Sequence, residues 1–144
     1  MLDALIFDMD GTMIDSMPSH KDSWAVFAQR QGLDVDIADL MRRTTGRTGV
    51  ECMRDLFDQP DMTVEQAMAH VHEKEAVYRE IFAPIFAEVA GFKDFFGQAH
   101  ARGLKLGVGT AGDRQNQAFA YQHLRMPIPP LTTVGGDELS LIHI

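Results

Sequence analysis

The chain has one cysteine, Cys52, among its 144 residues, which excludes an intrachain disulfide and is typical of a protein in a reducing compartment. It also lacks any apolar run long enough to cross a membrane. The first residues, Met1 to Asp3, lack the basic segment of a signal peptide. No internal repeat or low-complexity tract is present. We therefore expect a globular cytoplasmic protein that has no membrane partner.

Basic residues are in the minority, because 13 lysines and arginines stand against 21 aspartates and glutamates, with a formal net charge of −8. This balance argues against nucleic acid or an anionic membrane as the main partner. It does not exclude a phosphorylated substrate, because a bound cation and a few local basic groups can override the global charge. The length and the 45% hydrophobic content suit a compact domain with a core, and we expect a monomer.

The most informative stretch lies near the N-terminus and contains two closely spaced carboxylates. The apolar run Ala4–Phe7 predicts a buried strand that ends in a polar turn. Asp8 and Asp10 follow at once, and Gly11 lets the backbone turn sharply. Ligands of open parallel α/β sheets bind outside the carboxyl ends of the strands. The two acids are therefore placed where chemistry would occur.

Helical periodicity, capping residues and glycine or proline stops predict the other elements. Thr63 and Gln66 have the spacing of a capping box, which places the start of a long helix at Thr63. An apolar stripe on that helix is expected to include Val71, Tyr78 and Ile85. Helices are predicted over residues 16–31, 36–43, 49–57, 63–83, 92–101 and 113–124, and further strands over residues 104–109 and 132–135.

A possible phosphoryl clamp follows the second predicted strand, which ends in Thr110, Ala111 and Gly112. A hydroxyl and backbone N–H groups at a strand end, leading into a helix near Asp113, can hold the oxygens of a phosphoryl group. Many strands end in threonine, so this signal alone is weak. Its value comes from its position behind the two aspartates, with one helical insertion between them.

The stretch Asp8-Met9-Asp10-Gly11-Thr12, with its apolar lead-in and Asp15-Ser16 behind it, resembles motif I of the haloacid dehalogenase superfamily. The end of the second strand is similar to motif II. The insertion after motif I resembles the helical-cap branch, which includes β-phosphoglucomutase and sugar-phosphate phosphatases. The resemblance implies an α/β fold: a Rossmann-like three-layer core with a parallel sheet, incomplete here, and an inserted α-helical cap domain. Residues 1–15 and 88–138 would form the core, and residues 16–87 the cap.

The resemblance also implies a chemistry. Asp8 would be the nucleophile that forms an aspartyl-phosphate, and Asp10 the general acid and base. Mg²⁺ would bind Asp8 and the backbone carbonyl of Asp10. Thr110 and the Ala111 N–H would hold the phosphoryl oxygens. The implied function is a Mg²⁺-dependent phosphatase of a small phosphorylated metabolite, with a sugar phosphate expected. The enzyme alternative is β-phosphoglucomutase-like phosphoryl transfer, and Asp10 disfavours dehalogenation. For the two acids themselves, turn and capping chemistry is the alternative role.

Five residues of the expected cap are candidates for substrate contact: His20, Trp24, Gly46, Arg47 and Lys74. By spacing alone, His20 can be a half-buried structural histidine, Trp24 a core residue and Lys74 a snorkelling lysine. The resemblance instead places these three near the substrate. Gly46 and Arg47 lie in a polar loop that can hold an anion or serve as a solvated connection. Gly46 matches the loop of the mutases, but Arg47 does not sit at one of its basic positions, which weakens the mutase alternative.

The end of the sequence departs from the superfamily pattern. Relatives continue from a segment like residues 135–138 into a Gly-Lys-Pro that supplies the motif III lysine, and later into two motif IV acids that complete the magnesium site. Neither occurs here. Residues 139–144 match, codon for codon, a transposon end used in sequencing libraries, so we expect an adapter-derived tail on a truncated fragment. The alternative is a genuine short strand. The enzyme prediction therefore concerns the parent protein. For the chain as given we expect no turnover, and the non-enzyme alternative is an inactive fragment with an incomplete site.

Overall fold

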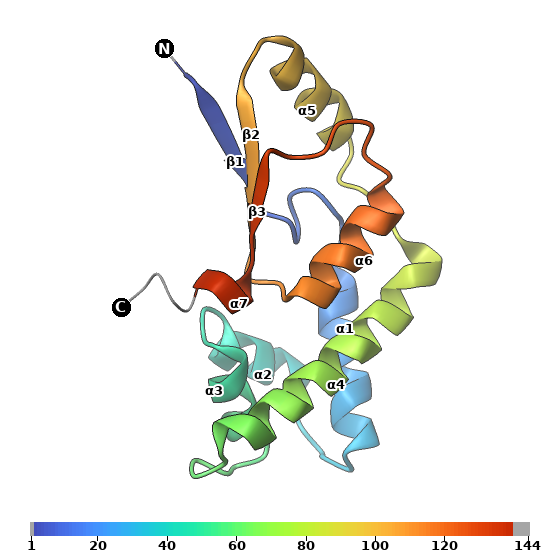
Figure 1. Cartoon of the computed structure of the whole chain (residues 1–144). Coiled ribbons are helices and arrows are strands. Elements are labelled where there is room, and N and C mark those ends of the chain that lie inside the picture. The colour runs from blue at the N-terminus through green and yellow to red at the C-terminus, as the bar shows by residue number, and fades with distance from the viewer. Residues whose placement is uncertain (1, 140–144) are drawn as a thin grey trace. The chain divides into compact units, whose positions relative to one another are not determined.

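The computed structural model describes residues 2–139 and divides into two compact units (Figure 1). Unit 1 comprises Met1–Met17 and Ile85–Ile144, and unit 2 comprises Pro18–Pro84. Unit 2 is therefore an insertion within the sequence of unit 1. The assignment of the units to a catalytic core and a cap stays a prediction. The expected adapter-derived tail lies outside the described residues, except for the backbone of Leu139.

Unit 1 is built on a three-stranded parallel sheet in the order β1-β2-β3, and the predicted α/β class is confirmed. Its elements are β1 (Ala4–Phe7), α5 (Phe92–Ala101), β2 (Lys105–Gly109), α6 (Arg114–Leu124), β3 (Thr132–Val134) and α7 (Gly136–Leu139). Leu5 pairs with Leu106, and Gly109 pairs with Val134. Because the strands are parallel, the residues that follow β1 and β2 emerge at the same edge of the sheet.

Helices α5 and α6 cover one face of this sheet (Figure 1). The ring of Phe7 in β1 lies 5.5 Å from that of Phe96 in α5, measured between centroids. In β3, Thr133 shares a hydrogen bond of 2.6 Å with the hydroxyl of Tyr121 in α6. Both Phe7 and Thr133 pair with Val108, so the two helices pack on the same face. Burial raises the pKa of the Tyr121 hydroxyl, which is consistent with a tight contact to the sheet.

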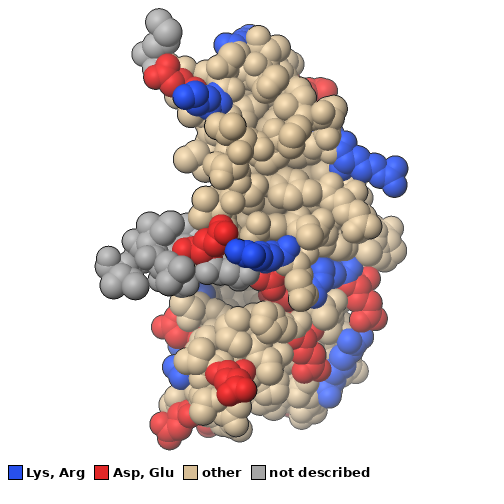
Figure 2. Space-filling view, viewed as in Figure 1, with Lys and Arg blue, Asp and Glu red and all other residues tan. Residues whose placement is uncertain are grey.

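The opposite face of the sheet is exposed within the described part of the chain. Ile6 points to this face and is 80% exposed, although the sequence predicted a buried strand. The expectation of a buried strand was wrong: Ala4 and Ile6 are exposed, and Leu5 and Phe7 are only half-buried, because side chains alternate between faces and β1 lies at an edge of the described sheet. On the face of the molecule drawn in Figure 2, the surface of unit 1 is mainly uncharged, whereas unit 2 displays acidic and basic side chains.

Unit 2 is helical, and its local capping follows the sequence closely. Its helices are α1 (Met17–Arg30), α2 (Ile37–Thr44), α3 (Gly49–Leu56) and α4 (Val64–Phe82), followed by the 3₁₀ turn η1 (Ala83–Ile85). Thr48 and Thr63 each form a complete capping box, with Glu51 and Gln66 respectively. The apolar core of the unit consists of Phe27, Leu40, Met53, Leu56, Met62 and Ala67.

The buried face of α4 differs from the expected stripe at its C-terminal end. Ile85 is 63% exposed, whereas Val77 and Phe82 are buried. The α-helix ends at Phe82, and the chain continues as a 3₁₀ turn that contains Pro84, so the α-helical period no longer applies to Ile85. Within residues 2–139, none of the helices combines the length and the hydropathy that a membrane span requires.

Candidate active site

The turn after β1 places two carboxylates at the edge of the sheet. Three residues within it, Met9, Met13 and Ile14, are almost fully buried and anchor the turn. Gly11 adopts a positive φ of 75° and donates its N–H to the Ile14 carbonyl. Asp8 is exposed and accepts the Met9 N–H at 2.7 Å through Oδ1. The apolar members of the turn thus face inward and leave the Asp8 carboxylate accessible.

Asp10 is held by a buried serine. The Ser16 hydroxyl donates to Asp10 Oδ1 at 2.6 Å, and Ser16 has no exposed surface. The sequence predicted Ser16 only as a helix cap, and this contact was missed. A serine six residues after an aspartate has many possible partners, so spacing alone could not reveal it. The hydrogen bond fixes Oδ1 of Asp10, and because the carboxylate is planar it also limits the position of the other oxygen, Oδ2.

The turn after β2 meets the turn after β1 at a glycine. Thr110 is 2% exposed, and its Oγ1 accepts the Gly112 N–H at 3.0 Å. A Cβ built on Gly112 would lie 3.3 Å from Thr110 Oγ1 and 3.9 Å from Asp10 Oδ2. The missing side chain of Gly112 therefore leaves space beside both the Thr110 hydroxyl and the Asp10 carboxylate. The structure brings together these two residues, which the sequence predicted separately.

The oxygen donors at this edge fit the preferences of Mg²⁺. Asp8 offers an exposed carboxylate, and the Asp10 backbone carbonyl lies in the same turn. Mg²⁺ commonly binds one or two carboxylates and completes its octahedral shell with water and substrate phosphate. Among residues 2–139, no group of three or more histidine, cysteine or acidic side chains could hold a metal by itself. The described residues could thus supply part of a magnesium shell, and this assignment stays a prediction.

Three of the five candidate cap residues meet within unit 2. Lys74 is 3% exposed, and its Nζ lies 3.1 Å from His20 Nδ1 and 2.9 Å from Glu75 Oε1. The same Nζ lies 5.0 Å from the centroid of the Trp24 ring. An ammonium group only donates hydrogen bonds, so Nδ1 of His20 is the acceptor. Lys74 is therefore a buried, internally paired cation, which differs from the snorkelling lysine considered from the sequence.

The ring of His20 is fixed by stacking. It lies 3.8 Å from the ring of Tyr78, centroid to centroid, with an interplanar angle of 5°. Tyr78 is buried in α4, one turn beyond Lys74. The tyrosine therefore holds the imidazole in the plane that lets Nδ1 face the ammonium group.

The remaining two candidates lie in the loop between α2 and α3. Gly46 has a positive φ of 78°, as a turn requires, and the Arg47 guanidinium lies 3.8 Å from Asp55 Oδ2. Neither belongs to the cluster around Lys74. Nearby, burial raises the pKa of the Cys52 thiol, which keeps it protonated and a poor nucleophile. The loop therefore carries a partly neutralised arginine, and the neighbouring helix α3 carries an inert thiol.

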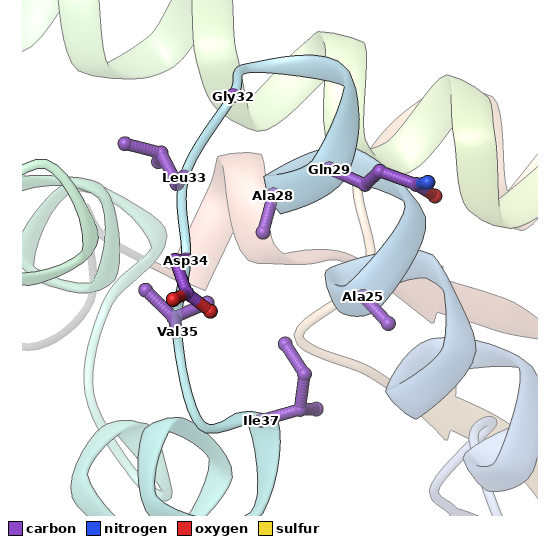
Figure 3. A pocket seen from close by; sticks show the side chains of 8 residues that line it. All are labelled: Ala25, Ala28, Gln29, Gly32, Leu33, Asp34, Val35 and Ile37. Carbon is purple, nitrogen blue, oxygen red and sulfur yellow. The ribbon is translucent and has the colours of Figure 1, made fainter.

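A shallow pocket of about 320 Å³ opens on unit 2 between the end of α1 and the start of α2 (Figure 3). Its walls include Ala25, Ala28, Val35 and Ile37, and Asp34 is the only charged residue that lines it. None of the candidate site residues belongs to it. The pocket is therefore separate from the predicted chemistry.

Comparison with known families gives a match over most of the chain. A family model described as haloacid dehalogenase-like hydrolase matches residues 2–128. A validoxylamine A 7'-phosphate phosphatase of Streptomyces hygroscopicus subsp. limoneus is 30% identical over 141 residues, which are 96% of this chain and 59% of that protein. A phosphorylated carbohydrates phosphatase of Thermotoga maritima is 26% identical, with 96% of this chain and 63% of that protein covered. The chain thus spans about three fifths of the length of these relatives.

Solved structures give the same fold. A family IA haloacid dehalogenase hydrolase from Entamoeba histolytica superposes with a TM-score of 0.80 at 22% identity, covering 91% of this chain and 61% of that one. A β-phosphoglucomutase from Clostridium difficile gives 0.77 at 19% identity, covering 96% and 63%. CbbY from Rhodobacter sphaeroides, solved in complex with phosphate, gives 0.75 at 19% identity, covering 95% and 64%. At these identities the likeness establishes the fold alone.

Proposed function

The chain belongs to the haloacid dehalogenase-like hydrolases, and we propose that it is part of a Mg²⁺-dependent phosphatase. The substrate would be a small phosphorylated metabolite, expected to be a sugar phosphate. The observation that carries the proposal is the meeting of Asp10 and Thr110 beside Gly112, at the carboxyl ends of two parallel strands. The phosphatase names of the two curated relatives support the substrate class. Those relatives are longer, so the proposal concerns the activity of a protein that contains these residues.

In the first step, a carboxylate oxygen of Asp8 attacks phosphorus and the bond from phosphorus to the leaving oxygen breaks. Asp10 donates a proton to that oxygen, so the product leaves as an alcohol and Asp8 carries the phosphoryl group. Ser16 holds Asp10 by its hydrogen bond and limits the rotation of the carboxyl group. The exposed position of Asp8 gives the substrate access to the nucleophile.

In the second step, Asp10 removes a proton from a water molecule as its oxygen attacks the aspartyl-phosphate. The bond from phosphorus to Asp8 breaks, which releases inorganic phosphate and restores both carboxyl groups. The Thr110 hydroxyl and the Ala111 N–H hold the phosphoryl oxygens in both steps. Mg²⁺, if held by Asp8 and the Asp10 carbonyl, would reduce the repulsion between the negative charges of the Asp8 carboxylate and the phosphoryl group.

The alternative function is phosphoryl transfer within a sugar phosphate, as in β-phosphoglucomutases. The resemblance of His20, Trp24 and Lys74 to residues of the mutase cap supports it, although Lys74 is 3% exposed and its Nζ already contacts His20 and Glu75 within unit 2. The pairing of Arg47 with Asp55 speaks against it, because this pairing reduces the positive charge that a second phosphate would need. Addition of a sugar 1,6-bisphosphate separates the two functions, since only a mutase requires it.

The direct test is phosphoryl transfer to Asp8. The protein is incubated with acetyl phosphate or with a panel of sugar monophosphates, with and without Mg²⁺. Intact-mass analysis then detects one added phosphoryl group, and released phosphate is assayed. In a protein of the relatives' length that contains these residues, we expect labelling or release that needs Mg²⁺ and disappears in Asp8→Asn. Binding of Mg²⁺ or phosphate without either product would favour the non-enzyme alternative for the 144-residue chain.

We further propose a monomer located in the cytoplasm, with a small phosphorylated metabolite rather than nucleic acid or a membrane as its partner. The single cysteine, the acidic balance and the phosphatase relatives support this assignment. Size-exclusion chromatography with light scattering tests the oligomeric state, and a dimeric mass would contradict it.

A further inference from the structure

Two adjacent glycines lie behind the turn formed by residues 110–112. The Gly136 N–H donates to the Gly112 carbonyl at 3.1 Å, and Gln117 Nε2 donates to the same oxygen at 3.0 Å. The Thr110 N–H donates to the Val134 carbonyl at 3.0 Å. The turn after β2 is therefore held from the side of β3 and α7, away from Asp10.

Gly136 is confined by backbone. A Cβ added to Gly136 would overlap the carbonyl oxygen of Ala111, and a backbone group cannot move aside as the end of a side chain can. Gly136 has no positive φ, so space and not conformation requires glycine here. At Gly135, an added Cβ would overlap the flexible end of Gln117 and would lie 3.1 Å from the Gly112 carbonyl oxygen, a milder backbone approach than at Gly136. Gly136 is therefore the member of the pair that controls the turn.

These contacts orient the peptide groups of the turn. The carbonyl groups of Ala111 and Gly112 both face the segment of Gly135 and Gly136. In a trans peptide, the N–H points opposite to the C=O of the same unit, and no cis peptide is present among the described residues. The amide hydrogens of Gly112 and Asp113 therefore point the other way. The Gly112 N–H indeed donates to Thr110 Oγ1, on the side where Asp10 lies.

This orientation matters to an anion. Carbonyl oxygens carry partial negative charge and repel phosphoryl oxygens, whereas amide hydrogens attract them. A turn whose carbonyls face away from the Asp10 side presents less negative potential to a phosphoryl group there.

We propose that Gly136 is a positioning residue that holds the carbonyls of Ala111 and Gly112 away from the bound phosphoryl group. The inference rests on the proposed function, because it takes residues 110–112 as the phosphoryl-binding turn. Gly136 itself touches no substrate. Its effect passes through the backbone of Ala111 and Gly112, and the ligand it serves is the oxyanion of a transferring phosphoryl group.

The test uses the whole ¹⁵N,¹³C-labelled chain, titrated with inorganic phosphate and followed by NMR. Gly136→Ala should shift the Gly112 carbonyl ¹³C and amide signals before phosphate is added, and should weaken phosphate binding at least tenfold. Gly97→Ala is the matched control, because a Cβ on Gly97 of α5 would meet nothing within 4 Å. Gln117→Met removes the second donor to the Gly112 carbonyl without a clash, and should weaken binding in the same direction.

The outcomes distinguish a failure of the Gly136 proposal from a failure of the proposed phosphoryl-binding function. If the wild-type chain shows no phosphate-dependent shifts at residues 110–113, the phosphoryl assignment itself is wrong. If the wild type binds phosphate, and Gly136→Ala or, should that variant not fold, Gln117→Met binds equally well, only the role of the glycine segment is overturned. Weakened binding in these variants, with Gly97→Ala unchanged, supports the proposal.

Discussion

The Ser16 hydroxyl donates a 2.6 Å hydrogen bond to Asp10 Oδ1 from a position with no exposed surface. We predict that Ser16→Ala lowers the free energy of unfolding by about 1–3 kcal/mol, because a carboxylate loses a buried donor. Urea denaturation of single variants and of the cycle with Asp10→Asn measures the coupling. Ser23→Ala is the control, since Ser23 is also buried but donates only to the His20 carbonyl within its own helix. An equal loss in both variants would show that the contact with Asp10 has no special weight.

The open space beside Gly112 gives a second prediction. Gly112→Ala should weaken binding of inorganic phosphate by about tenfold, ~1.4 kcal/mol, because its methyl would occupy the space beside Thr110 Oγ1 and Asp10 Oδ2. Stability should change by less than about 1 kcal/mol, since the nearest contact is 3.3 Å and φ is not left-handed. Isothermal titration and urea denaturation measure the two effects. Unchanged phosphate affinity in a folded variant would show that the ligand does not lie there.

Burial of Lys74 gives a third prediction, within unit 2. Lys74→Met should destabilise the protein by about 3–5 kcal/mol, because Glu75 loses a buried cationic partner and His20 loses its donor. Lys93→Met is the control, since Lys93 pairs with Glu88 at a partly exposed site and should cost no more than about 1 kcal/mol. Chemical denaturation compares the two. Similar small losses would mean that the Lys74 cluster is not an energetic centre of the unit.

The carboxylates of unit 2 give a prediction about pH. Hydrogen bonds from Arg43 and Arg42 lower the pKa of Asp39, and hydrogen bonds from Thr48 lower that of Glu51. A group with a depressed pKa in the folded state stabilises that state above its unfolded pKa and loses this effect as pH falls. The free energy of unfolding should therefore decline as the pH falls below the ordinary pKa values of the two groups, 4.5 for Glu51 and 3.8 for Asp39. Melting curves from pH 7 to pH 3 test this, and Asp39→Asn should flatten the decline. A decline of the same slope in Asp39→Asn would exclude this carboxylate as a cause.

Cys52 gives a prediction about reactivity. The thiol is 5% exposed, and burial raises its pKa. A thiol-specific reagent at pH 8 should therefore modify the native protein far more slowly than the urea-unfolded chain, because the thiolate is the reactive form. The raised pKa also means that the contribution of Cys52 to the free energy of unfolding is complete below pH 9.0, the ordinary thiol pKa, and falls as the pH rises above that value. Rapid modification under native conditions would show that α3 opens readily.

Local features of the fold could be predicted from the sequence, because they depend on neighbouring residues. The limits of β1 and the capping box at Thr63 were predicted at the observed residues. The exposure of Ile6 was not, since an apolar run does not reveal whether one face or both faces of its sheet are covered. The same run of residues would look identical in either setting.

The candidate site was predictable only in its parts. Asp8 and Asp10 stand out by their spacing after a strand, and Thr110 by its place at the end of another strand. The proximity of Asp10 to the turn of Thr110 joins residues about one hundred positions apart, and only the sheet register reveals it. Gly136 was not predicted, because a glycine required by the space beside a distant carbonyl has no local signature. The catalytic and binding roles themselves stay predictions.

The pairing of Leu5 with Leu106 has a consequence for the order of folding. These residues are 101 positions apart, and the whole of unit 2 lies between them. Unit 2 is continuous in sequence, so its contacts close shorter loops and can form while the chain is still being synthesised. β1 must wait for β2 to emerge before it gains a hydrogen-bonding partner. The strand that precedes Asp8 and Asp10 is therefore synthesised first and paired late, and until then the folded insertion separates it in sequence from its partner.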